Sequence, residues 1–289
     1  MNPEAVESWG MSNEEIAAYP TVYRDDLLAG KVVLIAGGDA GLGRATAYLC
    51  ARLGGEVMIC GPLQTELDAT VQGVKQHLGR DIQAQAMRIH QPEAVDALLA
   101  RVWQQFGKLD ILVNSGGGGQ TPGDAIDFSV EQWTDVVESK LNGCWYMMQK
   151  AAQRWREDEQ AGSIVNLVAD IWRGMPGLAH SCAADAGLVF AGNSLAVEWA
   201  PYNIRVNCVS HGTIARSDIS PTGPDNSAEL TRANPMLSCG DVMDIAEAVV
   251  YLAAPSGKFI TGECLTVDGG QKLWGEVWPN GKPDYFATP

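Results

Sequence analysis

The sequence predicts an α/β protein in which a parallel sheet is covered by helices on both faces. Seven short apolar runs alternate with longer segments that have helical spacing. The chain has 289 residues, of which 46% are hydrophobic and 19% charged, so it can bury one large core. No internal repeat or low-complexity tract interrupts the alternation. We therefore expect repeated strand–helix units in a single domain.

The expected elements follow from the periodicity along the chain. Two long amphipathic helices are expected at about 129–157 and 178–200, and Ser129 with Gln132 forms a capping pair at the start of the first. The second segment includes the stretch "HSCAAD". The expected strands are the apolar runs at 31–37, 56–60, 82–89, 109–114, 163–168, 204–209 and 264–269.

Two segments flank the predicted domain, which spans residues 29–270. Residues 1–28 form an N-terminal extension, and residues 271–289 form a C-terminal arm. The arm contains two Trp, a Tyr, a Phe and three Pro, so it is too aromatic to stay unpacked and too rich in proline for a helix. It is expected to pack as an extended segment, either on its own subunit or on a neighbour.

Charge and hydropathy exclude several classes of partner. The chain carries 20 Lys and Arg against 35 Asp and Glu, a formal net charge of -15, which repels nucleic acids and anionic membrane surfaces. The acidic N-terminus has no signal-peptide pattern, and no run of 18 apolar residues occurs. We expect a soluble, cytoplasmic protein that binds neither nucleic acid nor a membrane.

The seven cysteines do not form a recognisable framework. Their number is odd, they are widely spaced, and none forms a C-x-x-C pair or has a histidine at metal-ligand spacing. Buried free thiols in a reducing compartment are therefore expected, and no metal site is predicted.

Five motifs occur in a fixed order along the chain. The turn from Gly37 to Gly43 is followed by "LVNSGGGG", "GSIVNL", "LAVEWAPYNIRVNCVSHG" and "ITGECLTVDGG". With them, the chain resembles the short-chain dehydrogenase/reductase family over residues 29–270, especially its 2,4-dienoyl-CoA reductase-like branch. The resemblance implies a Rossmann-like, doubly wound parallel sheet of seven strands in the order 3-2-1-4-5-6-7. It also implies an NAD(P) cofactor and hydride transfer between a carbonyl and an alcohol.

The family's four catalytic positions carry other residues here. The resemblance implies a Tyr as general acid and base, a Lys that lowers its pKa, a Ser that binds the substrate oxygen and an Asn in a proton relay. These positions are occupied by Ser181, Asp185, Val168 and Lys140. A serine hydroxyl is a weaker acid than a phenol, and a neighbouring carboxylate raises the pKa of an acid. No catalytic residue is therefore assigned to this chain.

The replacements suggest a new contact and exclude a local nucleophile. Lys140 and Asp185 are expected to form a partly buried ion pair in the vacated site. A triad within the "HSCAAD" stretch is not expected, because helix geometry prevents His180 from linking Ser181 or Cys182 to Asp185. His180 is instead predicted to be a packed or rim histidine.

The cofactor positions are also altered. Gly61 and Pro62 stand where the family carries residues that select NAD or NADP, and Arg88 replaces an aspartate expected to hold the adenine amino group. We therefore expect no cofactor in this chain. Should a dinucleotide bind at all, the residues that would contact it are Gly37, Gly41, Gly43 and Asn114.

The leading hypothesis is a non-catalytic subunit that assembles with an active homologous subunit in a heterotetramer, the partner holding NAD. Known heteromeric members of the family pair an active with an inactive subunit, including an acyl-CoA alcohol dehydrogenase of anaerobic toluene breakdown. The two long helices would form the subunit contacts. Four large side chains there belong either to such contacts or to the core: Trp145, Met147, Met148 and Trp199.

Two alternatives remain open. The chain is an active, atypical oxidoreductase for hydroxyacyl or enoyl thioesters, with Lys140, Asp170 or His211 as a relocated proton donor. Otherwise it is a ligand-binding or sensing module that uses the former active-site pocket without a reaction.

Overall fold

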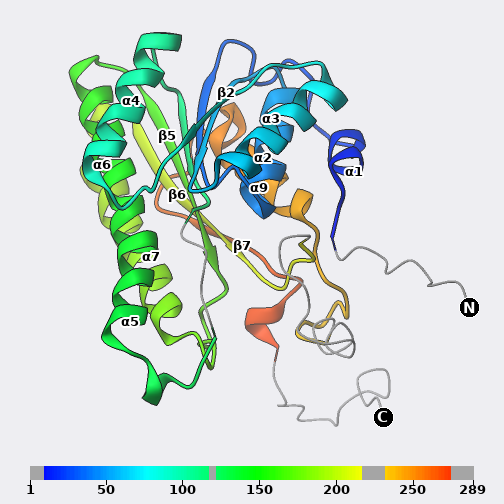
Figure 1. Cartoon of the computed structure of the whole chain (residues 1–289), viewed down its shortest axis with the longest axis vertical. Coiled ribbons are helices and arrows are strands. Elements are labelled where there is room, and N and C mark those ends of the chain that lie inside the picture. Colours follow the sequence, from blue (N-terminus) through cyan, green and yellow to red (C-terminus); the bar gives the residue numbers. More distant parts are fainter. Residues whose placement is uncertain (1–9, 117–121, 217–231, 275–289) are drawn as a thin grey trace, which may run out of the picture.

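Seven parallel strands form one sheet in the order β3-β2-β1-β4-β5-β6-β7, between two layers of helices (Figure 1). This computed structural model describes residues 10–116, 122–216 and 232–274. Both the doubly wound α/β fold and the strand order expected from the resemblance are confirmed. Strands β2 and β3 follow β1 on one side of the sheet, and β4 to β7 follow on its other side, so the strand order reverses between β1 and β4. At such a point, doubly wound folds form a crevice at the carboxyl ends of the strands.

Each apolar run of the sequence forms one strand. The central β1 is buried along its whole length because helices cover both faces of the sheet. The strands are β1 (Val32–Ala36), β2 (Glu56–Gly61), β3 (Gln83–Ala86), β4 (Ile111–Asn114), β5 (Gly162–Ala169), β6 (Ile204–His211) and β7 (Cys264–Val267).

The helices divide into two layers with separate hydrophobic cores. One layer packs on one face of the sheet through alternate strand residues such as Val33 and Ile35, and the other packs on Val32 and Leu34. The first layer contains α2 (Gly41–Arg52), α3 (Gln64–Leu78) and α9 (Val242–Ala253); the second contains α4 (Pro92–Phe106), α6 (Gly143–Glu157) and α7 (Ala179–Glu198) (Figure 1). Short 3-10 helices are η1 (Ala125–Asp127), η3 (Ala200–Tyr202), η4 (Pro255–Gly257) and η5 (Gln271–Leu273).

The helix expected at 129–157 contains a wider turn in its middle. It consists of α5 (Val130–Val136), a π-helical segment η2 (Val137–Asn142) and α6. Ser129 and Gln132 form the predicted capping box at its start. The π-helical turn carries Lys140, whose side chain is buried, and such turns are frequent at functional sites.

Residues 10–28 of the N-terminal extension pack on the folded domain. Its helix α1 (Asn13–Ala18) packs against α2 and α3, and Ile16 and Leu28 are buried in the core beside them. The Tyr23 hydroxyl donates a hydrogen bond to the carbonyl of Glu247 in α9, at 2.9 Å.

The first residues of the C-terminal arm pack on their own chain. In η5, the Gln271 Oε1 accepts hydrogen bonds from the backbone N–H and the hydroxyl of Thr213, each at 3.0 Å. The arm therefore begins against the loop that follows β6. Residues 275–289 lie outside the described part of the chain.

The large side chains expected on the long helices are mostly core residues. Met147 and Met148 are fully buried, while Trp145 and Trp199 are partly buried against the same core. For the two methionines the core alternative is therefore correct. The exposed apolar side chains of this layer include Phe190 on α7, which is 66% exposed.

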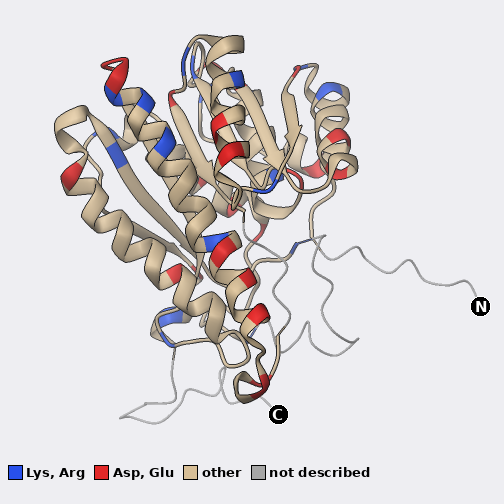
Figure 2. Cartoon of the chain, turned by 60° about the vertical axis from the view of Figure 1, so that its left-hand side comes forward, with Lys and Arg blue, Asp and Glu red and all other residues tan. Residues whose placement is uncertain are grey.

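The outer face of α7 carries almost no charge. Phe190 and Val197, which is 76% exposed, share this face with small residues, and the acidic residues of the helix are the buried Asp185 and the terminal Glu198. Figure 2 turns this helical layer forward. A helix that is apolar on all sides is typical of one covered by a further surface.

Four of the seven free cysteines are buried, as predicted for most of them: Cys50, Cys60, Cys144 and Cys208. Burial raises the pKa of the Cys50, Cys60 and Cys144 thiols to about 12. Cys182, Cys239 and Cys264 are partly exposed. In the described parts of the chain, no helix is long and apolar enough to cross a membrane.

Candidate functional site

The four positions that the resemblance aligned with catalytic residues meet at the carboxyl ends of the strands. Lys140 comes from η2, Val168 from the end of β5, and Ser181 and Asp185 from the first half of α7. The segments η2 and α7 pack against each other, and α7 also packs on β5 and β6. The order of motifs in the sequence correctly predicted that these segments are neighbours.

Lys140 and Asp185 form the ion pair that the sequence predicted. The Lys140 Nζ lies 2.8 Å from the Asp185 Oδ1, and both side chains are buried. The other carboxylate oxygen, Oδ2, accepts the backbone N–H of Ala169 at 3.2 Å. The pair thus joins η2 to α7 and, through the Ala169 N–H, to the end of β5.

Burial dominates the electrostatics of Asp185. It raises the pKa of the carboxyl above its usual value, and the nearby Lys140 ammonium and the Ala169 N–H oppose that shift. The Lys140 ammonium is thus paired directly with an anion, and the Asp185 carboxylate opposes its effect on the pKa of neighbouring acids.

Ser181 contacts His180, but this contact does not form a triad. The His180 Nδ1 accepts the Ser181 backbone N–H at 2.8 Å and lies 3.1 Å from the Ser181 Oγ. The His180 ring stacks on Phe128, with ring centroids 4.6 Å apart. His180 is therefore a packed histidine, as predicted, although its contact with the Ser181 hydroxyl was not expected. Among the described residues, no hydrogen bond joins it to Asp185.

Val168 and Asn114 contribute to the fold at the ends of their strands. Val168 is buried in the core beneath α6 and α7 and offers no polar group. The Asn114 amide donates to the Asn166 Oδ1 at 2.8 Å, and the Asn166 amide contacts the Met148 sulfur at 3.3 Å. The buried Asn114 Oδ1 has no hydrogen-bond partner within the described ranges, so one acceptor is available to a ligand or water.

The other candidate proton donors lie on the neighbouring strands. The His211 Nδ1–H donates to the Gly212 carbonyl at 3.0 Å, and the His211 carbonyl accepts the Asp170 N–H at 2.8 Å. Burial lowers the pKa of His211 to about 4, assisted by the positive charges of Lys140 and Arg216. Burial, with the charge of Asp268, raises the pKa of Asp170. His211 is therefore a neutral imidazole at pH 7.

We expect His211 to impose a pH dependence on stability. Because its folded-state pKa is depressed to about 4, the unfolded chain binds more protons between about pH 6.5 and pH 4. The free energy of unfolding should therefore decrease as the pH falls through this range. Denaturant titrations at several pH values should show a flatter profile for His211→Gln. The control His77→Gln should retain the wild-type profile; equal profiles for all three proteins would contradict the prediction.

The glycines of the first turn are required by internal contacts. A Cβ on Gly43 would lie 2.0 Å from the Gly37 carbonyl oxygen, and one on Gly37 would lie 2.8 Å from the Gly116 nitrogen. Gly37 and Gly41 also have positive φ angles, which glycine adopts readily. Their presence is therefore explained by the fold itself and does not by itself indicate a bound dinucleotide.

The sequence did not reveal one neighbour of Gly61, which lies at the end of β2. In the structure, the Asp39 carboxylate lies above it: a Cβ on Gly61 would be 2.6 Å from the Asp39 Cγ and Oδ1. Sequence reasoning missed this because the two residues lie 22 positions apart and only the folded turn brings them together.

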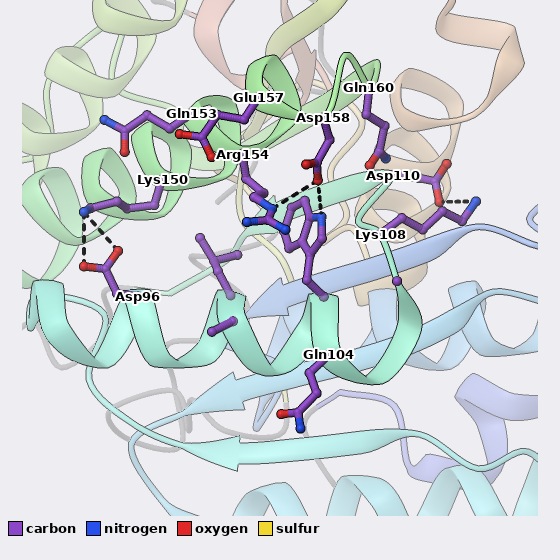
Figure 3. A pocket seen from close by; sticks show the side chains of 14 residues that line it. Asp96, Gln104, Lys108, Asp110, Lys150, Gln153, Arg154, Glu157, Asp158 and Gln160 are labelled. Carbon is purple, nitrogen blue, oxygen red and sulfur yellow. Dashed lines mark hydrogen bonds and ion pairs between the residues drawn. The ribbon is translucent and has the colours of Figure 1, made fainter.

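Two hollows of the described surface are considered for ligand binding, and the larger of these two is remote from this site. It has a volume of about 980 Å³ and lies between α4 and α6, towards the amino end of β4 (Figure 3). Its polar side chains bind one another: Lys150 pairs with Asp96 at 2.9 Å, and Asp158 accepts from Trp103 and Arg154. The smaller hollow, of about 270 Å³, lies between the start of α5 and Ala179.

The strand order, the glycine turn and the position of the site define an oxidoreductase scaffold of the dinucleotide-binding type. A family model described as enoyl-(acyl carrier protein) reductase matches residues 36–272. The chain belongs to the short-chain dehydrogenase/reductase family of oxidoreductases.

Curated relatives and solved structures agree with this assignment. The chain is 31% identical to a probable 2,4-dienoyl-CoA reductase of Bacillus subtilis over 84% of its length and 97% of that protein. It is 34% identical to the 3-oxoacyl-[acyl-carrier-protein] reductase FabG of Vibrio cholerae, covering 85% and 99%. A short chain dehydrogenase from Bacillus anthracis superposes with a TM-score of 0.81 at 32% identity, covering 87% of this chain and 100% of that one. Carveol dehydrogenase from Mycobacterium avium in complex with NAD gives 0.79 at 27% identity, covering 86% and 100%.

The residues fit the two halves of a dinucleotide differently. At the adenosine half, the glycine turn is present and the Asp39 carboxylate lies beside the end of β2. At the other half, the tuned acid and its unpaired cation are replaced by a buried serine and a closed ion pair. The residues present do not fit hydride transfer by the family's usual route.

Proposed function

We propose that this chain is a non-catalytic subunit of a cytoplasmic, hetero-oligomeric, NAD-dependent alcohol or hydroxyacyl-CoA dehydrogenase. It supports an active homologous subunit that holds the NAD, an arrangement of the kind represented by the heteromeric enzyme of anaerobic toluene degradation. The observation that carries the proposal is the buried ion pair between Lys140 and Asp185.

The ion pair bears on function because hydride transfer to or from a carbonyl carbon changes the negative charge on the carbonyl oxygen. A donor with a pKa near the working pH must stand beside that oxygen, and a cation must tune the donor. Here the only hydroxyl at the donor position is that of the buried Ser181, and the cation of Lys140 is neutralised by Asp185. The scaffold is retained while these two requirements are not met.

The outer face of α7 supports assembly with a second subunit. Phe190 and Val197 are exposed on a helix face that carries no charge between its first residue and Glu198. Such a face is typical of a subunit contact. The acyl-thioester and acyl-carrier-protein reductases among the relatives support an acyl thioester as the substrate class of the complex.

The proposal predicts that the purified chain alone does not oxidise or reduce hydroxyacyl-, oxoacyl- or enoyl-CoA with NAD(H) or NADP(H). The absorbance of the reduced nicotinamide measures this, with an intact FabG as the positive control. Turnover that is abolished by Asp170→Asn would contradict the proposal and support an active enzyme with a relocated donor.

Assembly is tested separately by co-expression with the intact short-chain dehydrogenase encoded nearest to this chain. A complex that elutes as one species and is active is expected, and Phe190→Glu should disrupt it. The control Phe259→Glu changes a side chain that is 99% exposed outside α7 and should leave the complex intact. An active partner that never associates with this chain would contradict the proposal.

A further inference from the structure

Two of the free cysteines face each other across neighbouring strands. Cys208 lies in β6 and Cys264 in β7, the edge strand, and the parallel register of these strands pairs the two residues directly (Figure 1). Residues paired in this way lie about 4.8 Å apart, and a disulfide spans Cα separations of about 4.4–6.8 Å. The backbone therefore holds the two cysteines at a separation that a disulfide can bridge.

Hydrogen bonds along the two strands fix this register. The Cys208 N–H donates to the Glu263 carbonyl at 2.8 Å. At the other end of the paired segment, the Gly212 N–H donates to the Val267 carbonyl at 3.0 Å. The Asn207 side chain adds a third link, because its Oδ1 accepts the Glu263 N–H at 3.0 Å. A slip of one residue would place the two thiols on opposite faces of the sheet, and it would break these bonds.

Both cysteine side chains lie on the same face of the sheet, but they differ in exposure. Each packs with the core beneath α4, α6 and α7. Cys208 is buried under α7, where a Cβ added to Gly192 would lie 3.7 Å from the Cys208 sulfur. Cys264 is partly exposed at the edge of the sheet. A reagent in solution therefore reaches Cys264 first, and Cys208 lies beside it as a resolving thiol.

The hydrogen bond between the two thiols supports this division of roles. It lowers the pKa of Cys264 below its usual value and raises the pKa of Cys208 well above it. The thiolate is the reactive form of a cysteine, so Cys264 is the thiol that reacts first. Burial instead raises the pKa of Cys50, Cys60 and Cys144 to about 12, which keeps those thiols protonated.

We propose that Cys208 and Cys264 form a redox site that is converted to a reversible disulfide by a low-molecular-weight disulfide such as oxidised glutathione. The Cys264 thiolate attacks one sulfur of oxidised glutathione, which forms a mixed disulfide and releases one glutathione thiolate. The Cys208 thiol then loses its proton and attacks the Cys264 sulfur, which releases the second glutathione. In all, the two protein thiols lose two electrons and two protons, and two molecules of reduced glutathione carry them away.

The disulfide would join the edge strand covalently to the sheet. Cys208 and Cys264 lie 56 positions apart, and the segment between them includes α9, so the bond would restrict a long loop of the unfolded chain. Oxidation should therefore raise the urea concentration at the midpoint of unfolding. The Cα separation is near the short end of the disulfide range, which favours a bond that reductants open readily. The inference goes beyond the proposed function, which uses no cysteine.

Treatment of the reduced, full-length chain with oxidised glutathione tests the proposal. Remaining thiols are then alkylated with N-ethylmaleimide, and mass spectrometry of the digested chain maps each cysteine. We expect a peptide that links Cys208 to Cys264 in the wild type, and dithiothreitol should restore both thiols. The oxidised chain should unfold at a higher urea concentration than the reduced chain.

Two variants separate the steps of the reaction. Cys208→Ser leaves Cys264 without a resolving thiol, so this variant should retain one glutathione on Cys264. The matched control Cys239→Ser removes a partly exposed thiol outside the pair, and it should still form the link between Cys208 and Cys264.

Two results would overturn the proposal: a treated wild-type chain in which Cys208 and Cys264 both remain thiols, or one in which Cys264 keeps its glutathione beside a free Cys208. Both are observed on the wild-type chain, so they remain decisive if a substitution fails to fold. The proposed function fails on other measurements, which are turnover by the isolated chain and the lack of an assembled complex.

Discussion

Replacing Lys140 by alanine is expected to destabilise the protein by about 3–5 kcal/mol, as removal of one partner from a buried ion pair does. The substitution leaves the Asp185 carboxylate buried with the Ala169 N–H as its remaining hydrogen-bond donor. Urea denaturation at pH 7 measures the loss. The double variant that combines Lys140→Ala with Asp185→Asn has no buried charge, so most of the stability lost in the single variant should return.

The pH dependence of that loss distinguishes a buried charge from lost packing. Burial already raises the folded-state pKa of Asp185, and Lys140 limits the rise. Without Lys140 the pKa rises further, so the folded state holds a proton more tightly than the unfolded chain. Stability then falls as the pH increases above the ordinary carboxyl range, and the cost of Lys140→Ala should shrink in acid.

A surface pair provides the control for this experiment. Lys150 and Asp96 are 2.9 Å apart, close to the 2.8 Å of the buried pair, but their side chains are 30% and 54% exposed. Lys150→Ala should cost less than about 1 kcal/mol and show little dependence on pH. Equal losses for Lys140→Ala and Lys150→Ala would show that the site does not depend on its ion pair.

Gly43→Ala is expected to cost about 3 kcal/mol or more in the absence of any nucleotide. Alanine usually stabilises a helix relative to glycine by about 1 kcal/mol, so the sign of the effect is reversed here. The reason is steric: the new Cβ would lie 2.0 Å from the Gly37 carbonyl oxygen, and the backbone must shift. Thermal and urea denaturation of the nucleotide-free protein measure the effect.

Gly192, in the middle of α7, is the matched control. A Cβ there would meet only the Cys208 sulfur and a Val206 methyl group at 3.7 Å, which is ordinary contact. Gly192→Ala should therefore be neutral or stabilising by up to about 1 kcal/mol. A Gly43→Ala variant as stable as the wild type, but with a weaker affinity for nucleotide, would contradict this prediction. It would mean that the glycine turn serves ligand binding and not the stability of the fold.

Most of the fold could be predicted from the order of patterns along the chain. All seven runs form strands. The central strands, such as β1 and β4, are buried along their whole length and must therefore be apolar throughout. The break within the helix at 129–157 was not predicted, since the residues of η2 have the same periodicity as an α-helix. The contribution of Ile16 to the core was also missed, because the short helix α1 is stabilised by tertiary contacts rather than by its own sequence.

The candidate site was predictable in part. The pairing of Lys140 with Asp185 followed from the expected proximity of two positions and from their opposite charges. The stacking of His180 on Phe128 could not be inferred, because these residues belong to separate elements whose approach depends on the packing of the helical layer.

The sequence by itself determined the class of fold, since periodicity is a local property. The order of the strands and the alignment of Lys140, Val168, Ser181 and Asp185 with catalytic positions were implied by the family resemblance. Only the tertiary structure decided which side chains lie next to one another. A glycine at position 61 appears in the sequence as the loss of an acidic residue. In the folded chain the turn places the Asp39 carboxylate at that point, because side-chain positions at the end of a strand depend on every segment that folds over it.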